Sequence, residues 1–243
     1  MNRAIRAIYK RLGIIHLGRR RVRDLIDFME DRKIDIVIDV GANVGQFGQS
    51  LRDEGYKGRI VSFEPIEAAF HELSKRASAD ANWQANHCGL GATSGEAVIH
   101  VSELSVCSSI LDLTSVASLH DSRVAVTRTE TIAIRTLDEV AANLSGSILL
   151  KIDTQGYEKQ VMEGGPQTVA RVKGILMELP VIHVYEGEWQ FHEAARYMAD
   201  RGFVPAQIQP VNYHGQDNVS VVDVDCLFRP LSEIDGAHSQ KTR

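Results

Sequence analysis

The first residues with a clear capacity for chemistry form a short loop, Asp39-Val40-Gly41-Ala42-Asn43-Val44-Gly45. The loop overlaps the end of the β-branched run 34–40, which is typical of a strand buried on both faces. Gly41 allows a sharp turn, and Gly45 allows the next helix to begin close to a ligand. Free N–H groups at such a helix start suit a carboxylate or a phosphate, and Asp39 offers an acceptor to an ammonium group.

The spacing of the glycines helps to choose between ligands. It reads G-x-x-x-G, with Asn43 where dinucleotide-binding loops carry a second glycine. A pyrophosphate therefore fits less well than the carboxylate and ammonium of an amino acid. Glu64 ends the next β-branched run, 25 residues after Asp39, where an acid accepts two hydrogen bonds from a ribose. The pattern predicts a nucleoside ligand, with S-adenosylmethionine favoured over NAD.

A third polar position follows the apolar run 147–152, where Asp153 ends a strong strand pattern. The carboxyl ends of parallel strands meet at one edge of a sheet, so Asp153 should face the same crevice as Gly41 and Glu64. Lys151 stands two residues earlier, and the pair could also be a structural ion pair.

Alternating strand and helix patterns account for the position of these residues. Helices are predicted from the loop to about 51, over 66–76 and over 193–200. Strands are predicted over 34–40, 59–63, 82–87, 97–101, 129–135, 147–152, 173–179, 203–208 and 220–228. The alternation predicts an α/β fold with a Rossmann-like, doubly wound, mostly parallel sheet. Residues 102–128 show little periodicity and are expected to form an insertion or lid near the site.

The composition excludes several classes of protein. Of the 243 residues, 44% are hydrophobic and 24% are charged, as in ordinary globular domains. No apolar run reaches the roughly 18 residues of a membrane span, and no signal-peptide pattern begins the chain. Three widely spaced cysteines predict neither a disulfide framework nor a zinc site. We therefore expect a cytoplasmic protein.

Charge is distributed unevenly along the chain. Residues 1–23 hold eight Arg or Lys and no acidic residue, so the remainder carries −13 within a net charge of −5. The acidic body argues against a nucleic-acid partner. The basic stretch has an apolar helical face, and it either packs on the domain or lies on an anionic membrane surface. The predicted organisation is a basic helical arm (1–33), one domain (34–230) and a C-terminal tail (231–243).

Four segments of the sequence resemble the FkbM family of S-adenosylmethionine-dependent O-methyltransferases. They are VIDVGANVGQF (37–47), VSFEP (61–65), LLKIDTQGYEKQVMEGG (149–165) and MELPVIHVYEG (177–187), ahead of GF (202–203) and DCLF (225–228). The likeness extends from about residue 34 to 228. It implies a class I methyltransferase that moves a methyl group from S-adenosylmethionine to a hydroxyl.

The resemblance implies a role for each matched position. Asp39, Gly41, Asn43 and Gly45 would hold the methionine end of the cofactor, Glu64 its ribose, and Gly89 and Leu90 would border its adenine. Asp153 would stand next to the transferred methyl group.

Removing the proton of a sugar hydroxyl calls for a general base. Asp153 is the first candidate and His183 the second. Glu178, Ser108 and Tyr185 are predicted to contact the acceptor. Nothing in the spacing of Asp153, Glu178 and His183 demands a metal ion, and none is predicted.

Only the resemblance to the FkbM family indicates the chemical class of the methyl acceptor. Members of the family methylate sugar hydroxyls of glycolipids and hydroxyls of macrolides. This implies a deoxysugar, fucose or rhamnose, on a glycolipid or a lipochitooligosaccharide. The alternatives are a macrolide or polyketide hydroxyl, and a catalytically silent module that binds S-adenosylmethionine. Residues 1–23 would hold an enzyme of the first kind at the inner membrane face, near its glycan or glycolipid partner.

Overall fold

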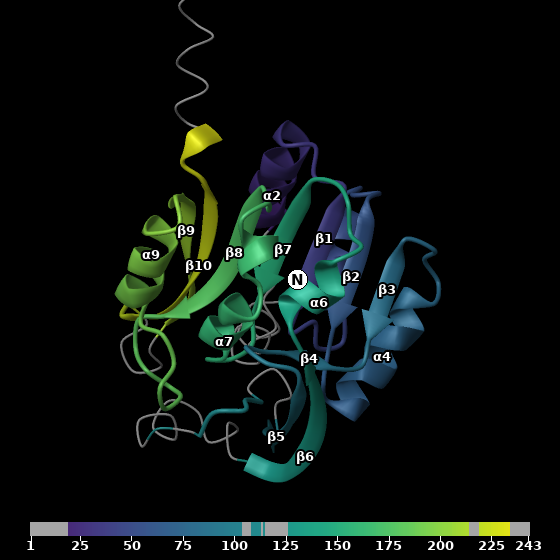
Figure 1. Cartoon of the computed structure of the whole chain (residues 1–243), viewed down its shortest axis with the longest axis vertical. Helices are drawn as coiled ribbons and strands as arrows, with labels where there is room; N and C mark the ends of the chain where they lie inside the picture. The colour runs from purple at the N-terminus through teal and green to yellow at the C-terminus, as the bar shows by residue number, and fades with distance from the viewer. Residues whose placement is uncertain (1–18, 104–107, 113, 115–125, 214–218, 234–243) are drawn as a thin grey trace, which may run out of the picture.

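The computed structural model of the chain describes residues 19–103, 108–112, 114, 126–213 and 219–233 (Figure 1). Its larger sheet has seven strands in the order β3-β2-β1-β7-β8-β10-β9. Their bounds are β1 (Ile36–Val40), β2 (Arg59–Phe63), β3 (Trp83–Asn86), β7 (Ile148–Ile152), β8 (Gly174–Pro180), β9 (Phe203–Tyr213) and β10 (Val221–Pro230).

Strand direction confirms the predicted Rossmann-like sheet. The pairs from β3 through β2, β1 and β7 to β8 are all parallel, and β10 is antiparallel to both β8 and β9. β10 therefore runs opposite to the other strands. The strand order turns back between β1 and β7, and ligands bind beside such a switch point. Val40 pairs with Ile152, so Gly41 and Asp153 leave the sheet at the same level.

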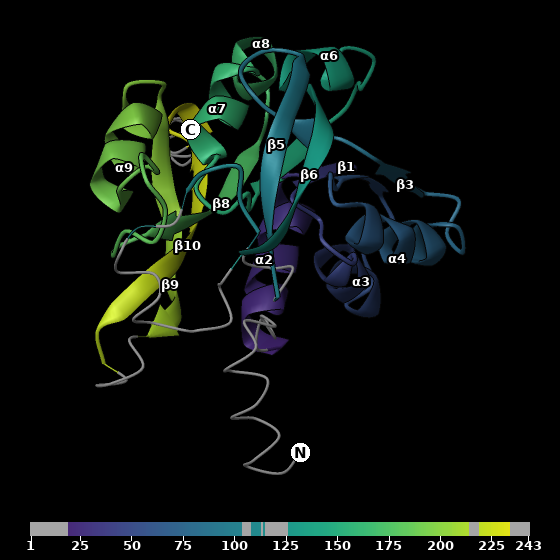
Figure 2. The ribbon, with the colours of Figure 1, turned by 90° about the horizontal axis from the view of Figure 1, so that it is seen from below.

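Helices cover both faces of this sheet (Figure 2). On one face lie α2 (Arg19–Asp31), α3 (Gln46–Asp53) and α4 (Glu67–Ala77). On the other face lie α6 (Leu137–Ala141), α7 (Glu158–Glu163), α8 (Pro166–Val169) and α9 (Phe191–Ala199). The predicted doubly wound arrangement is thus confirmed. α3, α4 and α9 fall within a few residues of the predicted ranges, whereas α6, α7 and α8 were not predicted.

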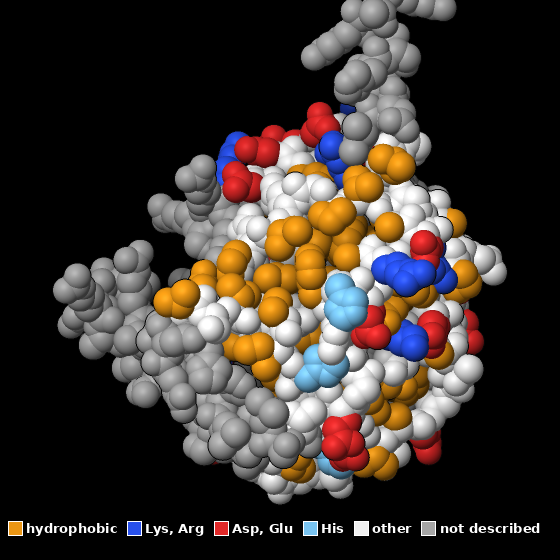
Figure 3. Space-filling model, turned by 90° about the vertical axis from the view of Figure 1, so that its left-hand side faces the viewer, with side chains coloured by type: hydrophobic (Ala, Val, Ile, Leu, Met, Phe, Trp, Pro, Cys, Tyr) orange, Lys and Arg blue, Asp and Glu red, His pale blue; other side chains and the backbone are white. Residues whose placement is uncertain are grey.

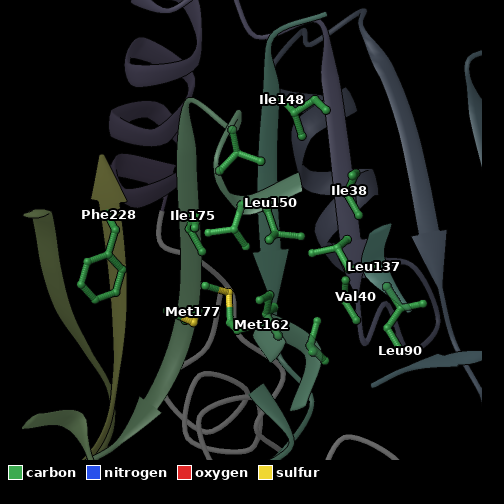
Figure 4. Close-up of a cluster of buried hydrophobic side chains, with 14 of the residues drawn as sticks. Ile38, Val40, Leu90, Leu137, Ile148, Leu150, Met162, Ile175, Met177 and Phe228 are labelled. Carbon is green, nitrogen blue, oxygen red and sulfur yellow. The ribbon is translucent and has the colours of Figure 1, made fainter. Parts of the chain in front are cut away.

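Alternation along the central strands builds one core on each face. Ile38 and Val40 of β1 pack with Leu150 of β7 toward α6 and α7 (Figure 4). Val37 and Leu149, one residue out of phase, pack toward α2 and α3. Every residue of β1 and β7 is buried, which explains the β-branched and aliphatic runs in the sequence, interrupted only by Asp39 and Lys151. These two strands form a rigid support for the loops that follow them.

A second, three-stranded sheet lies beyond the carboxyl ends of the first (Figure 1). Its strands, in the order β4-β6-β5, are β4 (Gly89–Leu90), β5 (Gly95–Ser102) and β6 (Val126–Arg135). It packs on the start of α4 through Ile66, Ile99 and Ile132, among others. The strands predicted over 97–101 and 129–135 therefore pair with each other instead of extending the main sheet.

Part of the predicted insertion adjoins this small sheet. Ser109 exchanges backbone hydrogen bonds with His100 of β5, at 2.8 and 3.2 Å. The segment 108–112 is thereby fixed next to the carboxyl ends of β1 and β7. Residues 104–107, 113 and 115–125 of the expected insertion lie outside the described residues.

The described part of the basic arm belongs to α2. Val22, Ile26 and Met29 of this helix are buried against the sheet. Residues 1–18 lie outside the described residues, so the proposed membrane contact of the arm stays a prediction. Within the ranges that the structure describes, no helix is both long and apolar enough to cross a membrane.

The face at the left of Figure 1, where β9 and α9 lie, carries a band of hydrophobic side chains (Figure 3). Ile208 and Tyr213 of β9 are exposed. β9 is the edge strand of the main sheet and contains Pro205 and Pro210, which have no N–H to offer to another strand. Prolines of this kind protect an edge from pairing with other chains.

Candidate functional site

A cavity opens at the carboxyl ends of β1, β2 and β7, between the main sheet and the small sheet. Its walls come from the loops after these strands, from β4 and β5, and from the segment 108–112. The lining residues are Val40, Gly41, Asn43, Gln46, Phe63, Glu64, Pro65, Ile66, Gly89, Leu90, Ile99, Ser108, Ile110, Asp153, Thr154, Gln155 and Tyr157.

The loop after β1 depends on backbone conformations that few residues adopt. Gly41 has a φ of 74°, and a Cβ there would overlap the carbonyl oxygen of Asp153. Asn43 has a φ of 47°, which asparagine tolerates better than most residues. The side-chain oxygen of Asn43 accepts a hydrogen bond from Val44 N–H at 2.8 Å. Gly41 therefore lets the loops after β1 and β7 lie in direct contact.

Glu64 is the buried acid of the cavity, with 4% of its surface exposed. Its Oε2 accepts a hydrogen bond from Asn43 N–H at 2.8 Å, and its Oε1 accepts one from Ile66 N–H at 2.9 Å. Burial raises the pKa of Glu64 to about 7, although the hydrogen bonds from Ile66 and Asn43 oppose the rise. The carboxyl thus ties the loop after β1 to the end of β2.

Lys151 links the loop after β1 to the loop after β7. Its ammonium lies 3.2 Å from Asp39 Oδ1 and 3.4 Å from Asp153 Oδ2, and it donates to the carbonyl oxygen of Gly41 at 3.1 Å. Burial alone would lower the pKa of Lys151, but attraction to Asp153 and Asp39 outweighs it and raises the pKa. Lys151 therefore stays charged and holds both loops.

Gln155 links Asp153 to the opposite wall. Its Nε2 donates to Asp153 Oδ1 at 2.9 Å, and its Oε1 accepts from the Tyr185 hydroxyl at 3.1 Å. The Ser109 hydroxyl donates to the Gln155 carbonyl oxygen at 2.6 Å. Three segments that are distant in the sequence therefore meet at Gln155.

Two further carboxyls fix the loops around Gln155. Glu158 Oε1 accepts hydrogen bonds from Thr154 N–H at 2.8 Å and from Gly156 N–H at 3.3 Å. Glu188 accepts in the same way from the N–H groups of Val184 and Tyr185. Burial raises the pKa of Glu158 and of Glu188 to about 7. Each carboxyl thus organises the loop that follows a parallel strand.

The sequence of this region matches a known family. The model of the "Methyltransferase FkbM domain" matches residues 39–205, which is more than half of the chain. The chain belongs to the FkbM methyltransferase family. The assignment agrees with the predicted cofactor, because the family uses S-adenosylmethionine. None of the curated proteins that were compared matches the sequence.

Solved structures are similar to this chain at low sequence identity. The FkbM methyltransferase of Methylobacillus flagellatus KT is 14% identical, with a TM-score of 0.50 over 81% of this chain and 43% of that one. The present chain thus spans less than half of that relative. Magnesium protoporphyrin IX methyltransferase of Synechocystis PCC 6803 was solved with bound SAM (10% identity, TM-score 0.47, 87% and 79% of the two chains) and with bound SAH (10%, 0.48, 95% and 88%).

Seven of the residues predicted for the FkbM site line the cavity. They are Gly41, Asn43, Glu64, Gly89, Leu90, Ser108 and Asp153. Ser108 is 7% exposed, and its hydroxyl oxygen accepts a hydrogen bond from Ser102 N–H at 3.1 Å. The structure therefore brings residues from five separate segments of the sequence to one cavity.

The remaining predicted residues lie around the cavity and not in its lining. Asp39 has no exposed surface and lies beneath the cavity, paired with Lys151 and accepting from the Ser62 hydroxyl at 3.1 Å. Gly45 faces away, because a Cβ there would meet Leu73 and Trp83. Both residues therefore support the loop after β1 from behind.

The second candidate base, His183, and the predicted acceptor contacts Glu178 and Tyr185 lie outside the lining of the cavity. The Tyr185 hydroxyl contacts the lining residue Gln155. Burial raises the pKa of Glu178 well above its usual value, and the charges of Asp153 and Asp223 add to the rise. The Nε2 of His183 is buried, with no hydrogen-bond partner among the described residues. The described residues contain no group of three or more His, Cys, Asp or Glu placed to hold a metal ion.

The sequence reasoning missed Gln46, Gln155 and Glu158 as contributors. Gln155 and Glu158 belong to the K-I-D-T-Q-G-Y-E segment, so the motif already contained them. Their partners, Tyr185 and the backbone of the same loop, emerge only from the folded arrangement. Gln46 is the first residue of α3 and carried no signal beyond its position after Gly45.

Proposed function

We propose that the protein is an S-adenosylmethionine-dependent O-methyltransferase whose acceptor is a hydroxyl of a sugar, a deoxysugar such as fucose or rhamnose on a glycolipid or lipochitooligosaccharide. The observation that carries the proposal is the convergence of Gly41, Glu64 and Asp153 on one cavity. The sugar is supported by the resemblance of the four sequence segments to family members that methylate such hydroxyls. The basic arm supports an acceptor at the inner membrane face.

The chain fits the proposed cofactor at three places. Gln46 lines the cavity, and its Oε1 is buried without a hydrogen-bond partner in the described part of the chain, so it can accept from an ammonium group. Glu64 lines the same cavity after β2, and its carboxylate would accept hydrogen bonds from a ribose diol. Gly89 and Leu90 provide a narrow apolar wall for adenine. When bound, S-adenosylmethionine supplies an activated methyl group on its sulfonium.

In the proposed reaction, Asp153 would orient the acceptor hydroxyl and accept its proton. Asp153 lines the cavity and has two oxygens, each with one donor from the protein, so each keeps acceptor capacity for a hydroxyl. A sugar hydroxyl that donates to Asp153 would be oriented for in-line attack. Its proton would pass to the Asp153 carboxylate as the C–O bond forms and the methyl C–S bond breaks, with S-adenosylhomocysteine as the leaving group. Ser108 and Ile110 line the cavity from the side of the small sheet.

The decisive experiment is calorimetric binding of S-adenosylhomocysteine, with NAD as the competing ligand. We expect micromolar affinity for S-adenosylhomocysteine in the wild type and at least about tenfold weaker binding in Glu64→Ala. This variant loses the hydrogen bonds from Asn43 N–H and Ile66 N–H as well as the proposed ribose acceptor. Glu67→Ala, an exposed acid at the start of α4, is the matched control. Binding of NAD alone would overturn the proposal.

A screen of acceptors follows if S-adenosylhomocysteine binds. Methyl transfer from labelled S-adenosylmethionine to fucosylated or rhamnosylated glycolipids would support the sugar acceptor. Transfer to macrolide or polyketide hydroxyls alone would correct the acceptor class. Binding with no transfer to any of these acceptors would favour a catalytically silent module.

A further inference from the structure

Gln155 occupies an unusual position in the loop between β7 and α7. Its φ is 54°, a left-handed conformation that residues other than glycine adopt infrequently. Such conformations persist where the surrounding structure holds them, and they gather at functional sites. Here the Ser109 hydroxyl holds the Gln155 carbonyl oxygen, and Glu158 holds the N–H groups on either side of Gln155. The loop thus presents the Gln155 side chain to the cavity.

The chemistry of Asp153 fixes the orientation of the Gln155 amide. An ionised carboxylate can only accept hydrogen bonds, so the amide NH₂ must face Asp153 and the amide oxygen must face away. The oxygen then requires a donor, and the Tyr185 hydroxyl supplies it at 3.1 Å. Tyr185 is 4% exposed, so its ring is held in place by packing. The direction of the whole chain of hydrogen bonds, from Tyr185 to Asp153, is therefore determined.

Asp153 is consequently held by two independent donors. Gln155 Nε2 contacts Oδ1 at 2.9 Å, and Lys151 Nζ lies 3.4 Å from Oδ2. Lys151 is shared with Asp39 and the Gly41 carbonyl, and so it secures Asp153 to the cofactor side of the cavity. Gln155 secures it to the acceptor side, through Tyr185 in the loop that follows β8. One donor fixes the position of the carboxylate, and the two together fix its plane.

We propose that Gln155 is a positioning residue for methyl transfer, which sets the plane of the Asp153 carboxylate toward the acceptor hydroxyl while Tyr185 sets the orientation of its amide. The inference rests on the proposed function, in which Asp153 receives the hydroxyl proton. It assigns a new role to Gln155, and it changes the role of Tyr185 from a direct acceptor contact to an indirect one.

The first test is a comparison of kcat with cofactor affinity in Gln155→Glu. This change keeps the size of the side chain but replaces the NH₂ donor with an acceptor that carries the same charge as Asp153. We expect kcat to fall about 10- to 100-fold, a part of the ~10²–10⁴-fold that a positioned base supplies. The Kd of S-adenosylhomocysteine should change less than about threefold, because the change disturbs the hydrogen bonds of Gln155 with Asp153 and Tyr185 on the acceptor side of the cavity. Tyr185→Phe should lower kcat by a smaller factor.

Gln49→Glu is the matched control. Gln49 Nε2 donates to Asp53 Oδ1 at 2.8 Å, so the same change breaks the same kind of hydrogen bond on the exposed surface of α3. We expect wild-type kcat in this variant. An unchanged kcat in Gln155→Glu, or a cofactor affinity that falls as much as kcat, would overturn the proposal.

Hydrogen exchange of the Gln155 side chain needs no catalysis, so it tests the role of Gln155 separately from the proposed function. The side-chain NH₂ signals of Gln155 in a ¹⁵N-labelled sample should exchange slowly with water in the wild type and rapidly in Asp153→Ala and Tyr185→Phe. If the wild type transfers no methyl group to any acceptor, the proposed function fails, and these signals still decide the role of Gln155. Fast exchange in the wild type, or no response to Asp153→Ala, would refute the positioning of Asp153 by Gln155.

Discussion

Buried carboxyls at this site act mainly as acceptors for the backbone of the loops that carry it. Glu64, Glu158 and Glu188 each accept two or more hydrogen bonds from nearby N–H groups. Such bonds shape loops that have no regular secondary structure. Burial nevertheless disfavours the charged form, and the pKa of each of the three rises to about 7. The site is therefore built from acids that are costly to ionise.

The raised pKa of Glu158 should make the free energy of unfolding depend on pH. Its pKa rises from 4.5 to about 7 because it is buried, so the folded state keeps a proton that the unfolded state has lost. The free energy of unfolding should thus fall as pH rises from about 4.5 to 7, by roughly 2–3 kcal/mol from this group. We expect Glu158→Gln to remove this part of the decrease, as measured by urea unfolding at several pH values. The exposed Glu163→Gln should keep the wild-type slope, and an equal slope in both variants would contradict the assignment.

Lys151 is the most consequential single charge among these residues. Lys151→Met leaves Asp39 without its cation in a fully buried position. Removal of one partner of a buried pair typically costs about 3–5 kcal/mol, and we expect a loss of this size in the free energy of unfolding at pH 7. Lys159→Met removes an exposed cation 4.0 Å from Glu163 and should cost less than about 0.5 kcal/mol. A loss below about 1 kcal/mol in Lys151→Met would show that Asp39 finds another partner.

At the scale of elements, the contact between the loops after β1 and β7 is the tightest in the site. A Cβ on Gly41 would overlap the Asp153 carbonyl oxygen, and the φ of 74° is unfavourable for alanine as well. We expect Gly41→Ala to destabilise the protein by roughly 3 kcal/mol or more and to abolish binding of S-adenosylhomocysteine. Gly55→Ala is the control for the effect of backbone conformation without a steric clash. Gly55 has a φ of 97°, and a Cβ there would have no atom within 4 Å. It should cost only about 1–2 kcal/mol and leave binding intact.

The elements of the main sheet were the most predictable part of the fold. Its central strands are buried on both faces, so their sequence is mainly aliphatic and β-branched, with Asp39 and Lys151 as the exceptions. The predicted range 59–63 coincides with β2. The small sheet was less predictable, because a half-exposed strand such as β6 has the same local pattern wherever it pairs. Pairing of 97–101 with 129–135 depends on how α4 packs against both, which no local pattern encodes.

At the scale of the whole molecule, the sequence predicted where the site lies better than how it is built. Asp39 and Asp153 end strands that are neighbours in the sheet, so topology brings them together. The sequence did not reveal that Asp39 would form an ion pair with Lys151 and would lie outside the lining of the cavity. Contacts such as Tyr185 with Gln155 join residues 30 positions apart. These contacts depend on the packing of two loops and carry no periodic signal.

The basic N-terminal stretch provides a prediction for the molecule as a whole. Arg3, Arg6, Lys10 and Arg11 precede an acidic body, so anionic vesicles should attract this end of the chain and repel the rest. Because Val22 of α2 is buried in the core, deletion of residues 1–18 should spare the fold, whereas deletion of 1–23 would disturb it. We expect the full chain to sediment with phosphatidylserine vesicles at low salt, and the shortened chain to stay in solution.

Two controls make this experiment specific to the arm. Vesicles of phosphatidylcholine alone should bind neither protein, and 0.5 M salt should release the full chain, because charges separated by more than a few ångström are screened at that concentration. The shortened chain should keep its affinity for S-adenosylhomocysteine, since the cavity is built from residues 40–157. If the shortened chain sediments as well as the full chain, residues 1–18 are not the membrane contact. Binding that resists salt would instead point to apolar insertion of its aliphatic face.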